Sequence, residues 1–297
     1  MIITIYRKYI PEDVRNSIYE AFLGVVLLYL RNPGGSLKAT YIYLFRYFLP
    51  DTEVNRLYAF MGRHGLMPIP YSFTLNYKKL HVVRYFDTQL ELPYAIHSGK
   101  RLYFPKSHTN TNKKKLYNYY KSLIIEQDVS SPHRYVRDIN RLKGKILLDV
   151  GAAEAIFSLD VIEQVNHIYI FECDTVWIEA LNATFAPWKD KVTIVRKYVG
   201  DSNNEDTVTL DRFFENKDKK NLFLKMDIEG CEQAALRGAF NLLKEASDID
   251  FSICTYHKKN DAVEIVAILA SYGFEHEQTD GYMYFEKQFR KAIIRRK

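Results

Sequence analysis

The stretch "LLDVGAAEAIFSLD", residues 147–160, has the pattern of a buried strand that turns at one glycine into a helix. A strand, a tight turn and a helix in this order form a cofactor loop in many α/β proteins. In dinucleotide loops, further glycines let the chain approach a diphosphate and let the helix pack on the strand. Here Ala152, Ala153 and Ala155 follow Gly151, and each Cβ crowds a diphosphate. The loop therefore favours a cofactor without phosphate, such as S-adenosylmethionine, over NAD or FAD.

From about residue 146 onward, short apolar runs alternate with segments of helical periodicity, which indicates a parallel sheet with helices on both faces. After the last helix, residues 274–278 and 282–287 flank the turn "TDG", which predicts a closing β-hairpin. The strands expected before this hairpin are 146–150, 168–172, 192–195, 222–227 and 250–256.

The first part of the chain has a different pattern. We expect an amphipathic helix over residues 12–31, a second helix over about 37–48, short strands within 80–104 and a helix over about 113–126. These elements predict a mixed, mainly helical N-terminal domain.

Three parts of the chain are therefore expected. Residues 1–140 form an N-terminal α+β domain that serves as an accessory or acceptor domain, and residues 141–289 form the sheet domain. Residues 290–297 read as a basic C-terminal tail.

Charge divides the chain of 297 residues unevenly. Residues 1–145 carry 23 Lys and Arg against 10 Asp and Glu, whereas residues 146–297 carry 19 against 26. A basic first half attracts anionic partners, such as nucleic acid, acidic lipid headgroups or an acidic sugar, although a solvated basic surface is the alternative.

The longest apolar stretch, residues 22–30, is shorter than the roughly 20 residues that span a bilayer, so no transmembrane segment is expected. Three widely spaced cysteines fit a reducing compartment, which predicts a cytoplasmic protein.

Carboxylates stand at the ends of three expected strands. Asp149 ends the first strand, and Glu172 ends the second, where ribose hydroxyls are bound in nucleoside sites. In "LFLKMDIEGCE", residues 222–232, Asp227 and Glu229 follow the fourth strand. Because ligands bind at the carboxyl ends of parallel strands, these groups are expected to face one crevice. There they favour a cationic sulfonium or act as a base toward an acceptor hydroxyl.

Two further groups of polar residues lie near this crevice. His257 follows the fifth strand and is a candidate general base or metal ligand, but no tight ligand spacing accompanies it and no metal site is expected. The polar segment 124–135 precedes the first strand and contains Gln127 and His133, which are candidates to contact the cofactor. A polar linker is the alternative interpretation of that segment.

The motifs "LLDVGAAEAIFSL", "IYIFECD", "TVTLDRFF" and "LFLKMDIEGCEQAALRGA" together resemble the FkbM-like methyltransferases, a branch of the class I S-adenosylmethionine-dependent enzymes. The resemblance covers about residues 146–287. It implies a Rossmann-like α/β fold, with a seven-stranded sheet whose last strand is antiparallel, S-adenosylmethionine as donor, and O-methylation.

The family's donor-site positions fall on Asp149, Gly151, Ala152, Glu172 and Asp227. Family loops commonly place a glycine where this chain has Ala155. This difference would be the reason for any weakened donor binding or activity.

The resulting hypothesis is an S-adenosylmethionine-dependent O-methyltransferase that methylates a sugar hydroxyl of a glycan or glycolipid, with Asp227, Glu229 and His257 as catalytic residues. Its acceptor is expected to be a small molecule or glycan, anionic or lipid-linked, with peripheral membrane contact left open. An Asn-Pro-Pro-Tyr type motif is missing after the fourth strand, so nucleic acid is not favoured. The alternative is a catalytically weak S-adenosylmethionine-binding module with a basic interaction domain. The sequence predicts no oligomeric state.

Overall fold

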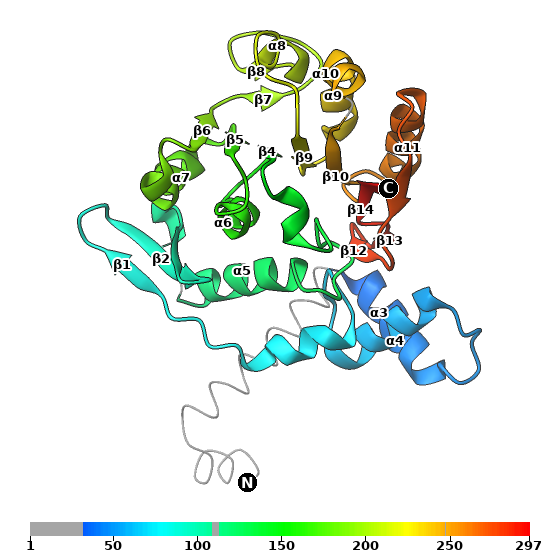
Figure 1. The fold of residues 1–297 in the computed structure, drawn as a ribbon. Helices are drawn as coiled ribbons and strands as arrows, with labels where there is room; N and C mark the ends of the chain where they lie inside the picture. The colour runs from blue at the N-terminus through cyan, green and yellow to red at the C-terminus, as the bar shows by residue number, and fades with distance from the viewer. Residues whose placement is uncertain (1–31, 109–112, 247) are drawn as a thin grey trace. The chain divides into compact units, whose positions relative to one another are not determined.

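The computed structural model describes residues 32–108, 113–246 and 248–297, which form two compact units (Figure 1). One unit extends to Leu75 and includes residues 284–289, and the other contains residues 76–283 and 290–297. The units thus divide the chain at different residues from the expected 1–140, 141–289 and 290–297. The helix expected at 12–31 and the apolar stretch 22–30 lie outside the described residues.

The larger unit is built on a seven-stranded sheet with the order β11-β14-β10-β9-β4-β5-β6. The strands β10, β9, β4, β5 and β6 are parallel, whereas β14 is antiparallel to both of its neighbours. This arrangement confirms the Rossmann-like α/β sheet of seven strands with an antiparallel last strand. The strands are β4 (Ile146–Val150), β5 (His167–Phe171), β6 (Val192–Val195), β9 (Leu222–Met226), β10 (Asp250–Cys254), β11 (His276–Gln278) and β14 (Ile293–Arg296).

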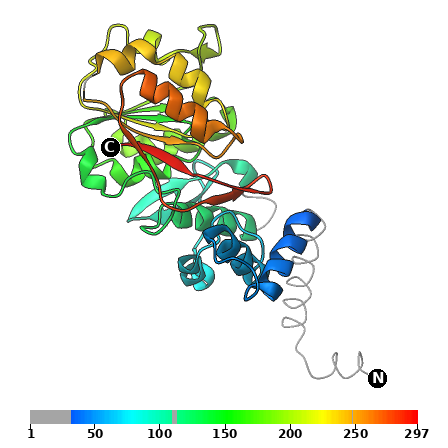
Figure 2. The same ribbon diagram turned by 90° about the vertical axis from the view of Figure 1, so that its right-hand side faces the viewer.

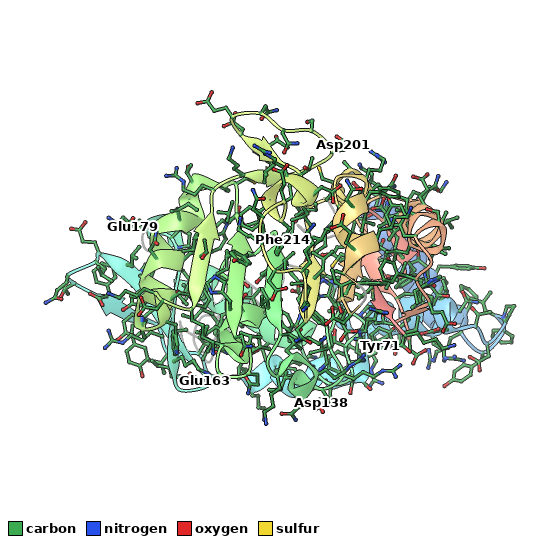
Figure 3. All side chains as sticks on the ribbon, turned by 45° about the horizontal axis from the view of Figure 1, so that its top comes forward. Tyr71, Asp138, Glu163, Glu179, Asp201 and Phe214 are labelled. Carbon is green, nitrogen blue, oxygen red and sulfur yellow. The ribbon has the colours of Figure 1, made fainter. Side chains whose placement is uncertain are left out.

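Helices cover both faces of this sheet, as Figure 2 shows for the yellow and orange helices on one face and the green helices on the other. On the face covered by α9, α10 and α11, buried side chains of the sheet and of these helices form one hydrophobic core. Phe214, labelled in Figure 3, belongs to this core. The helices of this unit are α5 (Lys113–Glu126), α6 (Ile156–Val161), α7 (Thr175–Phe185), α8 (Leu210–Phe213), α9 (Glu232–Arg237), α10 (Phe240–Glu245) and α11 (Asp261–Ser271).

Alternation along β9 sorts its side chains between the two faces. Leu222, Leu224 and Met226 enter the core beneath α9 to α11. Phe223 points to the opposite face, where its ring lies 6.2 Å from that of Phe157 in α6. Lys225 shares that face, so the sheet itself directs a buried cation toward the loop after β4.

The expected closing hairpin is wrong. β11 pairs with β14, while β12 (Met283–Phe285) pairs with β13 (Gln288–Arg290) in a separate two-stranded sheet. Residues 290–297 are therefore no tail. Ile293 and Ile294 belong to β14, which lies between β10 and β11, and their side chains are buried. The arginines that flank them made this segment look polar in the sequence.

Three expectations for the first part of the chain are confirmed. A three-stranded sheet consists of β1 (Tyr85–Asp87), β2 (Leu92–His97) and β3 (Lys100–Tyr103), and α5 has the expected bounds. In the smaller unit, the helix expected at 37–48 is α3 (Pro33–Phe45), followed by α4 (Glu53–His64).

The start of α3 lies earlier than expected because Asn32 caps it, accepting the N–H of Gly35 at 3.0 Å. Within the described residues, no helix is long and apolar enough to cross a bilayer.

Candidate functional site

A cavity of about 210 Å³ opens at the carboxyl ends of β4 and β9 in the larger unit. This is the position where ligands bind in open α/β sheets. Its walls come from α5, the segment before β4, the loop after β4 and the ends of β9 and β10. The residues that line it include Tyr119, Ser122, Leu123, Glu126, Gln127, Tyr135, Asp149, Gly151, Ala152, Ala153, Glu154, Ala155, Lys225, Asp227, Glu229 and Tyr256.

Gly151 is required by the close approach of two loops. Its φ is +76°, and a Cβ at this position would lie 1.9 Å from the carbonyl oxygen of Asp227. The N–H of Asp227 donates to the carbonyl of Val150 at 3.0 Å, so the chain after β9 is fastened beside the glycine. The single glycine therefore brings Asp227 to the cavity.

The alanines that follow Gly151 adopt an unusual backbone. Ala153 has φ 47° and Ala155 has φ 59°, both in the left-handed region that favours glycine. Each such residue costs roughly 1 kcal/mol relative to glycine. The loop thus keeps the conformation of a glycine-rich loop although its side chains are alanines.

Lys225 and Asp149 form a buried ion pair below the loop. Lys225 Nζ lies 2.9 Å from Asp149 Oδ1 and also donates to the carbonyl of Gly151. Burial alone would lower the pKa of Lys225, but the charges of Asp149 and Asp227 raise it. Ser158 Oγ donates to the second oxygen of Asp149 at 2.6 Å. The charge of Asp149 is therefore compensated within the protein.

The cavity as a whole is acidic. Five carboxylates line it, and Lys225 is the sole Lys, Arg or His among its described lining residues. Burial raises the pKa of Glu154 to about 7, and Tyr119 donates a hydrogen bond of 2.5 Å to its Oε2. Burial likewise raises the pKa of Glu126. Among the described residues, neither Glu126 nor Glu154 forms an ion pair, and a positively charged ligand beside them would favour their ionised forms.

Asp227 is held as an ionised carboxylate. The Tyr135 hydroxyl donates to Oδ2 at 2.7 Å, and His133 Nε2 lies 3.6 Å from the same oxygen. Burial alone would raise the pKa of Asp227, but the contact with His133 and the positive charge of Lys225 hold it well below its usual value. Asp227 therefore stays negatively charged at neutral pH.

His257 lies behind Asp227 and is oriented by a second carboxylate. Its Nδ1 is 2.7 Å from Oε1 of Glu232, and its Nε2 is 3.3 Å from Asp227 Oδ1 and 3.6 Å from Glu229 Oε2. Burial alone would lower the pKa of His257, but the hydrogen bond to Glu232 and the charges of the three carboxylates raise it. This imidazole is therefore a stronger base than an isolated histidine.

The expected site residues fall into two groups. Gln127, Asp149, Gly151, Ala152, Asp227 and Glu229 line the cavity, whereas Glu172, His133 and His257 do not. Glu172 accepts the N–H groups of Ala153 and Asp174, each at 2.8 Å, and so shapes the loop. His133 is 1% exposed and contacts Asp227 from the protein interior.

Several residues of the site were not singled out from the sequence. Glu154 stands inside the quoted loop, where its position next to two left-handed alanines is the one local signal. Tyr119, Tyr135, Tyr256 and Glu232 come from four separate segments. The tertiary structure alone brings Tyr119 to Glu154, Tyr135 and Tyr256 to Asp227, and Glu232 to His257.

Within the described part of the chain, two groups of side chains are close enough to hold a metal ion. One contains Asp227, Glu232 and His257, and the other His133, Asp227 and Cys254, with the atoms of each group within 4.8 Å of one another. The expectation that the site uses no metal stays a prediction.

The family model "Methyltransferase FkbM domain" matches residues 51–276, which is more than half of the chain. The chain belongs to the FkbM methyltransferase family. Family membership supports an S-adenosylmethionine-dependent methyltransferase.

Solved methyltransferase structures resemble this FkbM family member at low identity. The methyltransferase FkbM from Methylobacillus flagellatus KT is 18% identical over 60% of this chain and 54% of that chain, with a TM-score of 0.43. This chain thus spans about half the length of that protein. A putative RNA methyltransferase from Pyrococcus horikoshii is 14% identical over 58% of this chain and 85% of that chain (TM-score 0.35).

A third structure, a putative methyltransferase from Streptococcus mutans solved in complex with SAH, is 8% identical over 54% of this chain and 93% of that chain (TM-score 0.39). No match was found among curated proteins.

Proposed function

We propose that this chain is an S-adenosylmethionine-dependent O-methyltransferase that modifies a sugar hydroxyl of a glycan or glycolipid. The observation that carries the proposal is the acidic cavity beside the loop of Gly151. S-adenosylmethionine has a sulfonium and an ammonium but no phosphate, so carboxylates attract it, whereas they repel the diphosphate of NAD. When bound, it supplies a methyl group on a positively charged sulfur.

The residues that would hold the donor come from both sides of the cavity. Gly151 and Ala152 offer their backbone, and Glu172 fixes the loop through Ala153. The rings of Tyr119, Tyr135 and Tyr256 add aromatic surface, which favours a sulfonium through cation–π attraction. Gln127 and Asp149 line the same cavity, and His133 acts through Asp227.

The proposed catalytic residues have different tasks. Because the pKa of Asp227 is held low, this carboxylate stabilises positive charge and is a poor base. His257 does not line the cavity, so its proposed role is exerted through Asp227, whose Oδ1 is 3.3 Å from Nε2, while Glu232 orients the imidazole through Nδ1. The side chain of Glu229 is 87% exposed at the rim, where it can bind an acceptor hydroxyl.

The proposed acceptor is an anionic or lipid-linked glycan in the cytoplasm. The excess of basic residues in the first half of the chain supports an anionic acceptor. The free cysteines Cys173, Cys231 and Cys254 support a reducing compartment.

Calorimetric titration of the full chain with S-adenosylmethionine and with NADH tests the donor. We expect binding of S-adenosylmethionine to be at least about a hundredfold tighter, since two cationic groups are exchanged for two phosphates. Tight NADH binding without S-adenosylmethionine binding would overturn the proposal.

Mass spectrometry of cell-surface polysaccharide, with and without this protein, tests the reaction. A methyl ether on a sugar that depends on the protein supports the proposal, whereas methylation of nitrogen would exclude O-methyl transfer.

A further inference from the structure

The larger unit has a second cavity, of about 290 Å³, whose walls are mainly apolar. This volume is just below the roughly 300–1,000 Å³ range of small-molecule sites. Its apolar wall includes Leu80, Val82, Ala95, Ile96, Tyr120 and Ile124, and His81 also lines the cavity.

Helix α5 separates this second cavity from the donor cavity. Tyr119, Leu123 and Glu126 line the donor cavity, whereas Tyr120 and Ile124 line the second one. At 3.6 residues per turn, the two sets lie on faces of α5 roughly a third of a turn apart. The second cavity is therefore a separate site, one helix away from the donor.

The polar end of Tyr120 is satisfied inside the protein. Its hydroxyl is 2.9 Å from Nδ1 of His97 and donates to the carbonyl of Ile96 at 3.3 Å. The other nitrogen of His97 lies 2.7 Å from Asp160. Burial and the charge of Asp160 raise the pKa of Tyr120 to about 12, so the phenol stays neutral. Tyr120 thus offers its ring to the cavity, which suits an apolar ligand.

Two lysines lie near Leu80, which lines the cavity, although neither lysine lines it. The Tyr117 hydroxyl donates to the carbonyl of Leu80 at 2.8 Å, and Lys121 Nζ lies 5.9 Å from the centre of the Tyr117 ring. Lys78 precedes Leu80 by two residues, and burial together with the charge of Lys78 lowers the pKa of Lys121. Among the described residues, no carboxylate forms an ion pair with either lysine.

We propose that this second cavity binds a single-chain alkyl phosphate, with the alkyl chain against the wall of Ile96 and Ile124 and the phosphate between Lys78 and Lys121. A phosphate monoester carries nearly two negative charges, which match two ammonium groups better than one carboxylate does. Alkyl binding removes apolar surface of both partners from water.

The site has a clear use in the proposed reaction. If the chain methylates a lipid-linked glycan, the second cavity holds the lipid phosphate while the sugar reaches around α5 to the donor cavity. This role rests on the proposed function, whereas alkyl phosphate binding does not.

Calorimetric titration of the full chain with octyl phosphate, below its micelle concentration and without any methyl donor, tests the binding. We expect one molecule per chain. Butyl phosphate, inorganic phosphate and octyl glucoside should each bind at least about tenfold more weakly, because each lacks part of the chain or the charged head. Equal binding of inorganic phosphate or of octyl glucoside, or no octyl phosphate binding, overturns the proposal.

Two substitutions locate the site. Ile96→Asp places an anion in the apolar wall at a residue that is 44% exposed, and Lys121→Gln removes one cation. Each should weaken octyl phosphate binding about tenfold. Val263→Asp on α11 and Lys143→Gln before β4 are matched controls that should bind as the wild type does. Thermal unfolding followed by circular dichroism confirms that each variant is folded.

Wild-type binding in both Ile96→Asp and Lys121→Gln overturns the assignment to this cavity. Titration of the same samples with S-adenosylmethionine separates the two proposals. Octyl phosphate binding without donor binding supports the second cavity and contradicts the proposed function, and the converse result contradicts the second cavity alone.

Discussion

The two cavities beside α5 differ in nearly every chemical respect. The donor cavity is lined by carboxylates with one buried lysine, whereas the second cavity has mainly apolar walls and no lysine among its lining residues. Both use the same helix, "KKKLYNYYKSLIIE", through different faces. The helix contributes Glu126 to the donor cavity and Ile124 to the second one, and the loops and strands that close over α5 extend this difference in polarity.

Backbone conformation separates the two cavities as well. Ala153, Ala155 and Glu229, which line the donor cavity, all have positive φ values. None of the residues that line the second cavity has a positive φ. Strain of this kind collects where a backbone must approach a ligand or a reacting group. Backbone strain is therefore concentrated at the donor cavity, and substitutions there should have the larger effects on stability and activity.

The largest effect is expected for Gly151→Ala. The new Cβ would lie 1.9 Å from the carbonyl of Asp227, so β4 and β9 must separate at their ends. We expect a loss of at least about 4 kcal/mol in the free energy of unfolding, measured by urea denaturation. Gly144→Ala, where a Cβ meets no atom within 4 Å, is the control for left-handed strain alone. Equal losses in both variants would mean that contact with Asp227 is not the cause.

Asp227→Asn should lower turnover about a thousandfold while the protein remains folded. The amide is nearly the same size but cannot provide the negative charge that His133, Lys225 and His257 surround. Methyl transfer assays on purified protein measure this effect. Asp201→Asn, at a surface carboxylate paired with Arg237, is the matched control. Near-normal turnover in Asp227→Asn would remove this charge from the mechanism.

Glu154→Gln should change stability in a pH-dependent manner. The pKa of Glu154 is raised to about 7, so the folded state binds more protons than the unfolded state between pH 4.5 and 7. Stability therefore falls as pH rises through this interval. The variant should be more stable by up to about 3 kcal/mol at pH 8 and unchanged at pH 4 in urea denaturation.

The ionisation of Glu154 should also make donor affinity depend on pH. Ionised Glu154 attracts a cation, so wild-type affinity for S-adenosylmethionine should increase as pH rises through about 7. Glu154→Gln should flatten this dependence and leave octyl phosphate binding unchanged. A change in both ligands would show that the two cavities are coupled through α5.

The smallest effect is expected for Ala155→Gly. At φ 59°, removing the Cβ relieves left-handed strain, and we expect a gain of about 1 kcal/mol minus the added freedom of the unfolded chain. Donor affinity should stay equal or improve in calorimetric titration. A marked loss of affinity would give the alanine methyl group a role of its own.

Local patterns in the sequence were sufficient for much of the fold. Buried strands read as apolar runs, so β4, β6 and the start of β9 and β10 lie where they were expected, and α5 has its expected bounds. Strand-end carboxylates placed Asp227 and Glu229 at the cavity, because parallel strands end at one edge of a sheet.

Pairing partners were decided by the tertiary structure. The sequence indicated two short strands after α11 and predicted that they pair with each other. In the structure, β11 pairs with β14 instead. Such pairing depends on which edge of the sheet is free, and this is a property of the assembled sheet. Glu172 likewise turned toward the N–H groups of Ala153 and Asp174, which no linear spacing reveals.

The element types and the loop of Gly151 follow from the amino-acid sequence alone, because periodicity and backbone freedom act over a few neighbouring residues. The tertiary structure decided the chemistry of the site. The raised pKa of Glu154, the lowered pKa of Asp227 and the apolar wall beside α5 arise from burial and from charges that distant segments bring within a few ångströms.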